Sequence, residues 1–241
     1  MEQPLDIPHS RAPKQRRSRE SYDRMIEAAI ELLKEGGLGA LTLAAVSRRS
    51  HVSIGSIYCR VDGKDALLRE VQGIVLQQME REFALLVSRV RRKQLALREL
   101  VPTLVSELAH YLRRHSGLLA AFIQQGDRDP RVEEAGRKSY AQTIMDFNLV
   151  LLERKSEFRH PDPEHAATTV FSVVYSALGR FLGLNAGAPG HGGAGEGNWQ
   201  QLVEDLGLMS LAFVILDLRE TMGEQSKPID TGRATGRRKA G

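Results

Sequence analysis

The stretch LTLAAVSRRSHVSIGSIYCRVDGKDALL, residues 41–68, decides the fold of this chain. It predicts a short helix over Leu43–Arg49 with one apolar face, and Thr42 is a good N-cap for that helix. Residues 51–53 predict a tight turn, Ile54–Arg60 a second short helix, and Lys64 the start of a longer one. This layout is typical of a helix-turn-helix, whose second helix can lie in the major groove of DNA.

The second short helix carries the side chains that suit a groove. Gly55 and Ser56 are small, so the backbone can approach DNA closely. Arg60 can reach a guanine edge or a phosphate, and the Tyr58 hydroxyl can hold the DNA backbone. The N-termini of the first short helix and of the long helix expose N–H groups that favour a phosphate. The predicted DNA-contacting residues are Thr42, Ser53, Ile54, Gly55, Ser56, Tyr58, Cys59, Arg60 and Lys64.

Three segments carry a family resemblance: AAIELLKEGG at 28–37, LTLAAVSRRSHVSIGSIY at 41–58 and VDGKDALL at 61–68. They make the run from Glu20 to Val71 similar to the tetracycline-repressor (TetR) family of bacterial transcription regulators. The resemblance implies that residues matching Thr42, Tyr58 and Lys64 touch phosphates and that the third helix of the chain reads the groove. It also implies that the rest of the chain serves dimerisation and ligand sensing.

Two departures from the family pattern are informative. His51 stands where the family usually has glycine in the turn, and histidine tolerates a positive φ better than most residues. Cys59-Arg60-Val61 replaces the usual aromatic-histidine-phenylalanine after the tyrosine. This replacement suggests an added electrostatic role for Arg60 and a base preference of this chain's own.

Composition favours a cytoplasmic protein. The chain of 241 residues is 41% hydrophobic and 27% charged, within the globular range, and its net charge of +4 indicates no partner by itself. Cys59 is the only cysteine, which excludes an intramolecular disulfide and fits a reducing compartment. We expect no signal segment at the N-terminus. The most apolar run, Ala166–Leu184, contains Arg180 and several hydroxyls, so we expect a buried or interface helix and no membrane span.

The periodicity predicts an all-α chain with four regions. Residues 1–18 form a flexible basic arm suited to DNA phosphates or the minor groove. Residues 19–78 form the DNA-binding domain, with its helix-turn-helix motif at 42–61. Residues 79–223 form a helical effector-binding and dimerisation domain, and 224–241 a disordered tail. Helices are expected at Glu20–Glu35, Lys64–Lys93, Leu97–Arg114, Gly117–Gln125, Arg131–Ser156, Pro163–Leu184 and Asn198–Met222, with a glycine-rich linker at 185–197.

Two sets of residues in the larger domain are candidates for binding. Polar and aromatic side chains on the central helices are candidates for a cavity that holds an unknown small-molecule effector. These are His110, Phe122, Gln125, Tyr140, Asn148, Phe171 and Tyr175. The last two helices are strongly apolar. The resemblance implies that they pair with their twins as a homodimer interface, which would present two recognition helices to a near-palindromic operator of double-stranded DNA.

Two alternatives remain open. His160, Asp162, Glu164 and His165 have metal-ligand side chains, so an all-α metal-dependent enzyme is one of them. Asp162 followed by Pro163 favours a helix start instead. A helical interaction module that binds no DNA is the other. The leading interpretation is a ligand-released, DNA-binding repressor that is not an enzyme and has no catalytic residues, metal or cofactor.

Overall fold

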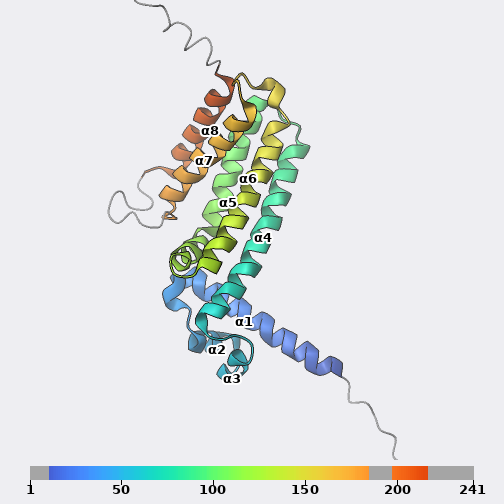
Figure 1. Cartoon of the computed structure of the whole chain (residues 1–241), viewed down its shortest axis with the longest axis vertical. Helices are drawn as coiled ribbons and strands as arrows, with labels where there is room; N and C mark the ends of the chain where they lie inside the picture. The colour runs from blue at the N-terminus through green and yellow to red at the C-terminus, as the bar shows by residue number, and fades with distance from the viewer. Residues whose placement is uncertain (1–10, 185–196, 217–241) are drawn as a thin grey trace, which may run out of the picture.

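The computed structural model describes residues 11–184 and 197–216, and every regular element within them is helical. A small helical bundle lies at one end of an elongated bundle of longer helices (Figure 1). The all-α prediction is confirmed, and so is the division into a small N-terminal bundle and a larger helical part. Residues 1–10 of the predicted arm, the predicted linker except for Gly197, and the predicted tail lie outside the described residues.

The small bundle consists of α1 (Arg11–Ala40), α2 (Leu43–Ser50) and α3 (Ile54–Tyr58), closed by the start of α4 (Lys64–Arg92). One apolar stripe of α1 faces inward, and the side chains that meet there are fully buried. They include Met25, Ala29, Leu33, Val46, Ile57, Leu67 and Leu68. Because α2 and α3 are too short to be stable alone, this shared core fixes their positions.

The first helix begins earlier than the sequence predicts. We expected it to start near Glu20 after a flexible arm, but it is helical from Arg11. Pro13 lies in the first turn, where a missing N–H removes no intrahelical hydrogen bond, so it does not break the helix. The predicted stop at Gly36-Gly37 is confirmed, since both residues have non-helical backbone angles and Gly37 has φ of 60°.

The long helix α4 joins the small bundle to the larger one. Gly63, with φ of 103°, makes the turn before it, and a side chain is strained at such an angle. One face of α4 stays buried from end to end, from Leu67 through Val75 and Phe83 to Val90. The first part of that face belongs to the core of the small bundle and the rest to the large one, so α4 is shared by both.

The larger bundle is arranged around α5 (Leu97–Gly126), which packs against α1, α4, α6, α7 and α8. The helices α6 (Pro130–Leu152), α7 (Pro163–Phe181) and α8 (Trp199–Ile215) follow, with a short 3-10 turn at Lys155–Glu157. Each of the three is capped by a side chain that accepts backbone N–H groups: Asp129, Asp162 and Asn198.

Several predicted helix ends were wrong. The helix α5 is continuous through Gly117, where we expected a break, because its apolar stripe continues through Leu118 and Phe122 into the same core. The third helix ends at Tyr58 rather than Arg60, since the Arg60 N–H turns back to Ile57. The helix predicted to Ser156 ends at Leu152, α7 ends at Phe181, and α8 ends at Ile215 within the described residues.

The turn between α2 and α3 gives a test of the fold. His51 has φ of 55° and ψ of 30°, as its position predicted. His51→Val should lower the free energy of unfolding by about 1–2 kcal/mol, because a β-branched residue pays the full cost of the left-handed conformation. His51→Gly should change it by less than about 1 kcal/mol. Urea denaturation measures both.

The matched control is His110→Val, since His110 is an exposed histidine within α5. Histidine and valine have similar helix propensities, so this change should stay within about 0.5 kcal/mol. Equal losses of unfolding free energy in His51→Val and His110→Val would show that the left-handed backbone conformation at His51 does not cause the destabilisation.

Candidate nucleic-acid interface and its linked cavity

The turn of the helix-turn-helix is held by short-range hydrogen bonds. The Thr42 hydroxyl accepts the Ala45 N–H at 3.1 Å and caps α2, as predicted. The Ser47 hydroxyl donates to the Val52 carbonyl at 2.7 Å, and the buried Ser50 hydroxyl accepts the Val52 N–H at 3.2 Å. Sequence reasoning missed Ser47 and Ser50, because serines are common in turns and their spacing alone does not identify these bonds.

The outward side of α3 is free for a partner. Ile57 is fully buried, whereas Ile54 is 45% exposed and Tyr58 is 60% exposed. The other predicted contact residues at 53, 55, 56 and 59 are also exposed, so the six lie together on one surface. The Ser53 hydroxyl accepts the Ser56 N–H at 3.2 Å and caps α3. A small, polar, projecting surface of this kind suits a groove.

Two predicted cations already have partners within the protein. Arg60 donates through Nη2 to the carbonyl and the hydroxyl of Ser18, both at 3.1 Å, and through Nη1 to the Ser56 carbonyl at 3.2 Å. Lys64 donates from Nζ to the Leu38 carbonyl at 2.7 Å. Both side chains therefore fix the neighbouring helices as well as adding positive charge beside α3.

A further contact joins α1 to α4 beside the same surface. The Tyr22 hydroxyl donates to Glu70 at 2.6 Å. Burial, and after it the hydrogen bond to the Glu70 carboxylate, raises the pKa of Tyr22 to about 12. Tyr22 therefore stays a neutral donor at physiological pH. This pair could not be predicted from a local sequence pattern, because its members are 48 residues apart.

A cavity of about 540 Å³ lies between α4, α5, α6 and α7. Three of the seven predicted ligand residues line it: Phe122, Tyr140 and Tyr175. Phe171 is fully buried behind the two tyrosines and packs against both rings. The lining that sequence reasoning missed comes from α4, α5 and the first half of α6, including Gln72, Leu76, Met79, Leu119, Ile123, Val132, Gly136 and Ser139.

The other three predicted ligand residues lie outside the cavity lining. His110 is exposed, and its ring lies 2.7 Å from the Ser106 carbonyl in the preceding turn. Asn148 donates to the Thr168 hydroxyl at 3.1 Å, which ties α6 to α7. Gln125 is buried and donates to Asp65 at 3.4 Å, which ties α5 to α4. Residue type alone could not separate these structural roles from ligand contact.

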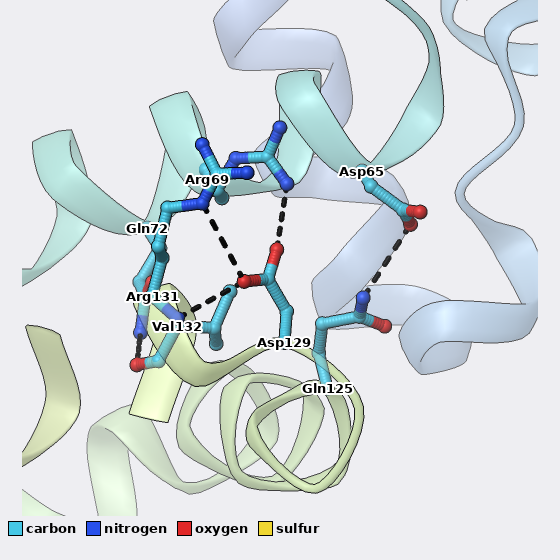
Figure 2. Close-up of polar contacts among 7 residues, drawn as sticks. All are labelled: Asp65, Arg69, Gln72, Gln125, Asp129, Arg131 and Val132. Carbon is cyan, nitrogen blue, oxygen red and sulfur yellow. Dashed lines mark hydrogen bonds and ion pairs between the residues drawn. The ribbon is translucent and has the colours of Figure 1, made fainter. Parts of the chain in front are cut away.

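Polar contacts join α4 to the junction of α5 and α6, at the rim of the cavity (Figure 2). Arg69 binds the Asp129 carboxylate at 2.6 Å, and Gln72 donates to the Val132 carbonyl at 2.9 Å. The Asp129 side chain also accepts the Arg131 N–H at 3.0 Å and so caps α6. A shift of this junction would therefore pull directly on the first half of α4.

The histidine-containing segment before α7 has a structural role. Asp162 accepts the His165 N–H at 2.9 Å and caps the helix, with Pro163 in its first turn, as the sequence favoured. The His160 ring accepts the Asp162 N–H at 3.1 Å. Among residues 11–184 and 197–216, no group of three or more His, Cys, Asp or Glu side chains could hold a metal ion.

Comparison with known proteins agrees with this geometry. The family model described as "Bacterial regulatory proteins, tetR family" matches residues 25–71, which run from α1 into α4. The matched segment, 47 of the 241 residues, is that of the TetR family of bacterial regulatory proteins. The model describes regulatory proteins, which agrees with the predicted transcription regulator. A search of curated proteins gave no match.

Solved structures extend the similarity from this segment to the whole fold. A protein from Mesorhizobium loti, described as a TetR-family regulator, is 15% identical with a TM-score of 0.65, over 82% of this chain and 96% of its own. Salmonella enterica GusR is 20% identical, with a TM-score of 0.54 over 80% and 95%. Bacillus subtilis FadR, in complex with stearoyl-CoA, is 13% identical, with a TM-score of 0.54 over 82% and 99%. At these identities the similarity establishes the fold alone.

None of the helices in the described part of the chain has the length and apolarity that crossing a membrane requires. The predicted contact residues from 42 to 64 fall within the segment that matches the family model. The residues that line the cavity lie outside this segment. The nearest of them, Gln72, follows directly after its last residue, 71.

The Arg69–Asp129 ion pair gives a pH-dependent prediction. The hydrogen bond from Arg69, with the Arg131 N–H, holds the pKa of Asp129 below its usual value. A carboxyl group whose pKa is lowered by folding stabilises the protein at pH values above its pKa in the unfolded chain. This stability is lost as the pH falls through the pKa of the group in the folded protein. Asp129→Asn, which keeps a capping side chain, should be less stable than wild type at pH 7. The difference should shrink below about pH 4.

Urea denaturation across this pH range measures the effect. Glu134→Gln is the control, because in the described part of the chain Glu134 pairs only with Arg137 and Lys138 of its own helix. Exposed ion pairs of this kind contribute little to stability. Glu134→Gln should therefore lower the free energy of unfolding less than Asp129→Asn does. A loss for Asp129→Asn that stays constant down to pH 3 would contradict the role of the ion pair.

Proposed function

We propose that the protein is a homodimeric repressor that a small molecule releases from its operator. One observation carries this proposal: α4 is a single helix whose first turn follows the DNA-facing segment and whose middle lines the cavity. A molecule in the cavity and a duplex at α3 would therefore both act on α4. The proposal places the protein in the cytoplasm, where its exposed Cys59 thiol suits reducing conditions.

In this proposal the contact residues divide into two groups. The side chains of Thr42, Tyr58 and Lys64 hold phosphates and set the position of α3 on the duplex. Residues 53–56 together with Cys59 and Arg60 face the base edges and provide the sequence preference. The exposure of α3 supports this division, because its buried side is occupied by Ile57 alone. The basic first turns of α1 add charge that attracts the phosphate backbone.

Release follows from the position of the cavity beside the α5–α6 junction. A ligand against the start of α6 would move the backbone that carries Asp129 and Val132. Because these residues bind Arg69 and Gln72, α4 would shift and change the separation of the two recognition helices in the dimer. Operator affinity falls only if the ligand prefers the shifted geometry. The structure of FadR in complex with stearoyl-CoA supports the idea that a protein of this fold accepts a small molecule.

The dimer in this proposal forms through α7 and α8. Both helices leave large apolar side chains in solvent: Val173 is 51% exposed, and Leu208 and Met209 are each 63% exposed. Exposed apolar residues gathered on two adjacent helices mark an interaction surface. Pairing with a second copy would form a four-helix interface, and its two-fold symmetry matches a near-palindromic operator.

The DNA-binding role is tested by gel shift with the DNA upstream of the protein's own gene. Tyr58→Ala, Lys64→Ala and Arg60→Ala should each lower the affinity at least about 10-fold, because each dimer loses two contacts to DNA of about 1 kcal/mol or more. Arg89→Ala is the charge-matched control, since Arg89 is exposed near the far end of α4. Unchanged affinity in all three variants would refute the proposed interface.

The dimer interface is tested by sedimentation. The double variant Leu208→Glu with Met209→Glu should raise the dimer dissociation constant at least about 100-fold. Burial of each such side chain contributes about 2 kcal/mol, and each side chain occurs twice in a two-fold symmetric dimer. Leu85→Glu is the control, since Leu85 is 66% exposed on α4. A stable dimer of the α8 double variant would exclude this surface.

A further inference from the structure

The cavity is long, narrow and charged only at its rim. Its lining on α5 runs from Tyr111 to Gly126, about 22 Å of helix, and its lining on α6 runs from Pro130 to Thr143, about 20 Å. A volume of about 540 Å³ spread over that length leaves room for a slender molecule. The four charged lining residues all lie at the α5–α6 end and are exposed: Asp127, Arg128, Glu133 and Arg137.

The rim does not select a charge, since it carries two cations and two carboxylates. Arg137 is further engaged by Glu134 at 2.5 Å. Beyond the rim no lining residue is charged. An ionic group placed there would lose its hydration without gaining a counter-ion, which is costly. The inner part of the cavity therefore favours a molecule without charge.

The inner end is built from tyrosines, and only one of them uses its hydroxyl within the protein. Tyr111 donates to the Met79 carbonyl at 3.1 Å. The rings of Tyr140 and Tyr175 meet edge to face at 4.8 Å, and neither hydroxyl has a hydrogen-bond partner among the described residues. Both rings line the cavity, so these two donors are available to an occupant.

The electrostatics of the inner end agree with an uncharged occupant. Burial, and after it the neighbouring Tyr140, raises the pKa of Tyr175 to about 12. The Tyr175 hydroxyl therefore stays protonated and donates across the physiological range. Burial and then the Glu82 carboxylate raise the pKa of Tyr111. Negative charge near the inner end disfavours an anion, and no carboxylate lines that end to pair with a cation.

We propose that the cavity binds a slender, largely apolar and uncharged molecule whose carbonyl or ether oxygen accepts hydrogen bonds from Tyr140 and Tyr175. This inference rests on the proposed function, in which the cavity is the effector site. The chemistry is that of a long-chain ketone, ester or lactone. The acceptor lies at the aromatic end, and the apolar body lies along Leu76, Leu119 and Ile123 towards the rim.

The experiment compares four probes that share an eleven-carbon chain: 2-undecanone, undecane, undecanoate and undecylammonium. Calorimetry and intrinsic fluorescence measure their affinity for the full-length protein. The ketone should bind tightest. Tyr140→Phe and Tyr175→Phe should each weaken ketone binding by about 2- to 10-fold, the usual effect of one neutral hydrogen bond, and leave alkane binding within about 2-fold.

Tyr111→Phe is the matched control inside the same cavity, because its hydroxyl is already used by Met79. This variant should lower the melting temperature but leave the ratio of ketone to alkane affinity unchanged. Tighter binding of undecanoate or undecylammonium than of the ketone would overturn the proposal. So would an unchanged ratio in both Tyr140→Phe and Tyr175→Phe, or the absence of binding by all four probes.

A gel shift with the same probes separates this inference from the proposed function. Release of DNA by a charged probe and not by the ketone would refute the ligand class and leave the repressor intact. Absence of DNA binding by the free protein would refute the repressor, while the calorimetric comparison would still decide the ligand class. Release by the ketone that needs about 2- to 10-fold more ketone in Tyr175→Phe supports both.

Discussion

The burial of one face of α4 along its whole length is the constraint on which the rest of the structure depends. Leu67 and Leu68 complete the core of the small bundle, while Phe83 and Val90 belong to the large one. A helix packed at both ends in this way cannot move locally without disturbing one core or the other. The Arg69–Asp129 pair adds a polar tie at the point where the two cores meet.

The helices with strong periodicity and good caps could be predicted from the sequence. Thr42 and Asp162 each cap the helix that the pattern assigned to them. The errors came where local signals compete with packing. Pro13 and Gly117 suggested interruptions, yet Pro13 falls in a first turn that tolerates it and Gly117 is bracketed by buried leucines. Only the three-dimensional core decides such cases.

The two candidate sites differ in how far the sequence defines them. Most of the predicted DNA-contacting residues lie within 53–60, in or directly beside one short helix, so a local pattern exposes them together. The cavity is assembled from four helices whose lining residues lie up to 103 positions apart, between Gln72 and Tyr175. Its two free tyrosines could be proposed from residue type, but Met79 and Gly136 could not, because only packing brings them to the same space.

Cys59 gives the chain a chemical property that the fold did not require. It is the one thiol in 241 residues, and it is exposed at the C-terminal end of α3. A thiol-reactive dye can therefore attach at a single place, directly on the surface assigned to DNA. The native sequence is thus already suited to site-specific labelling, without the removal or introduction of any cysteine.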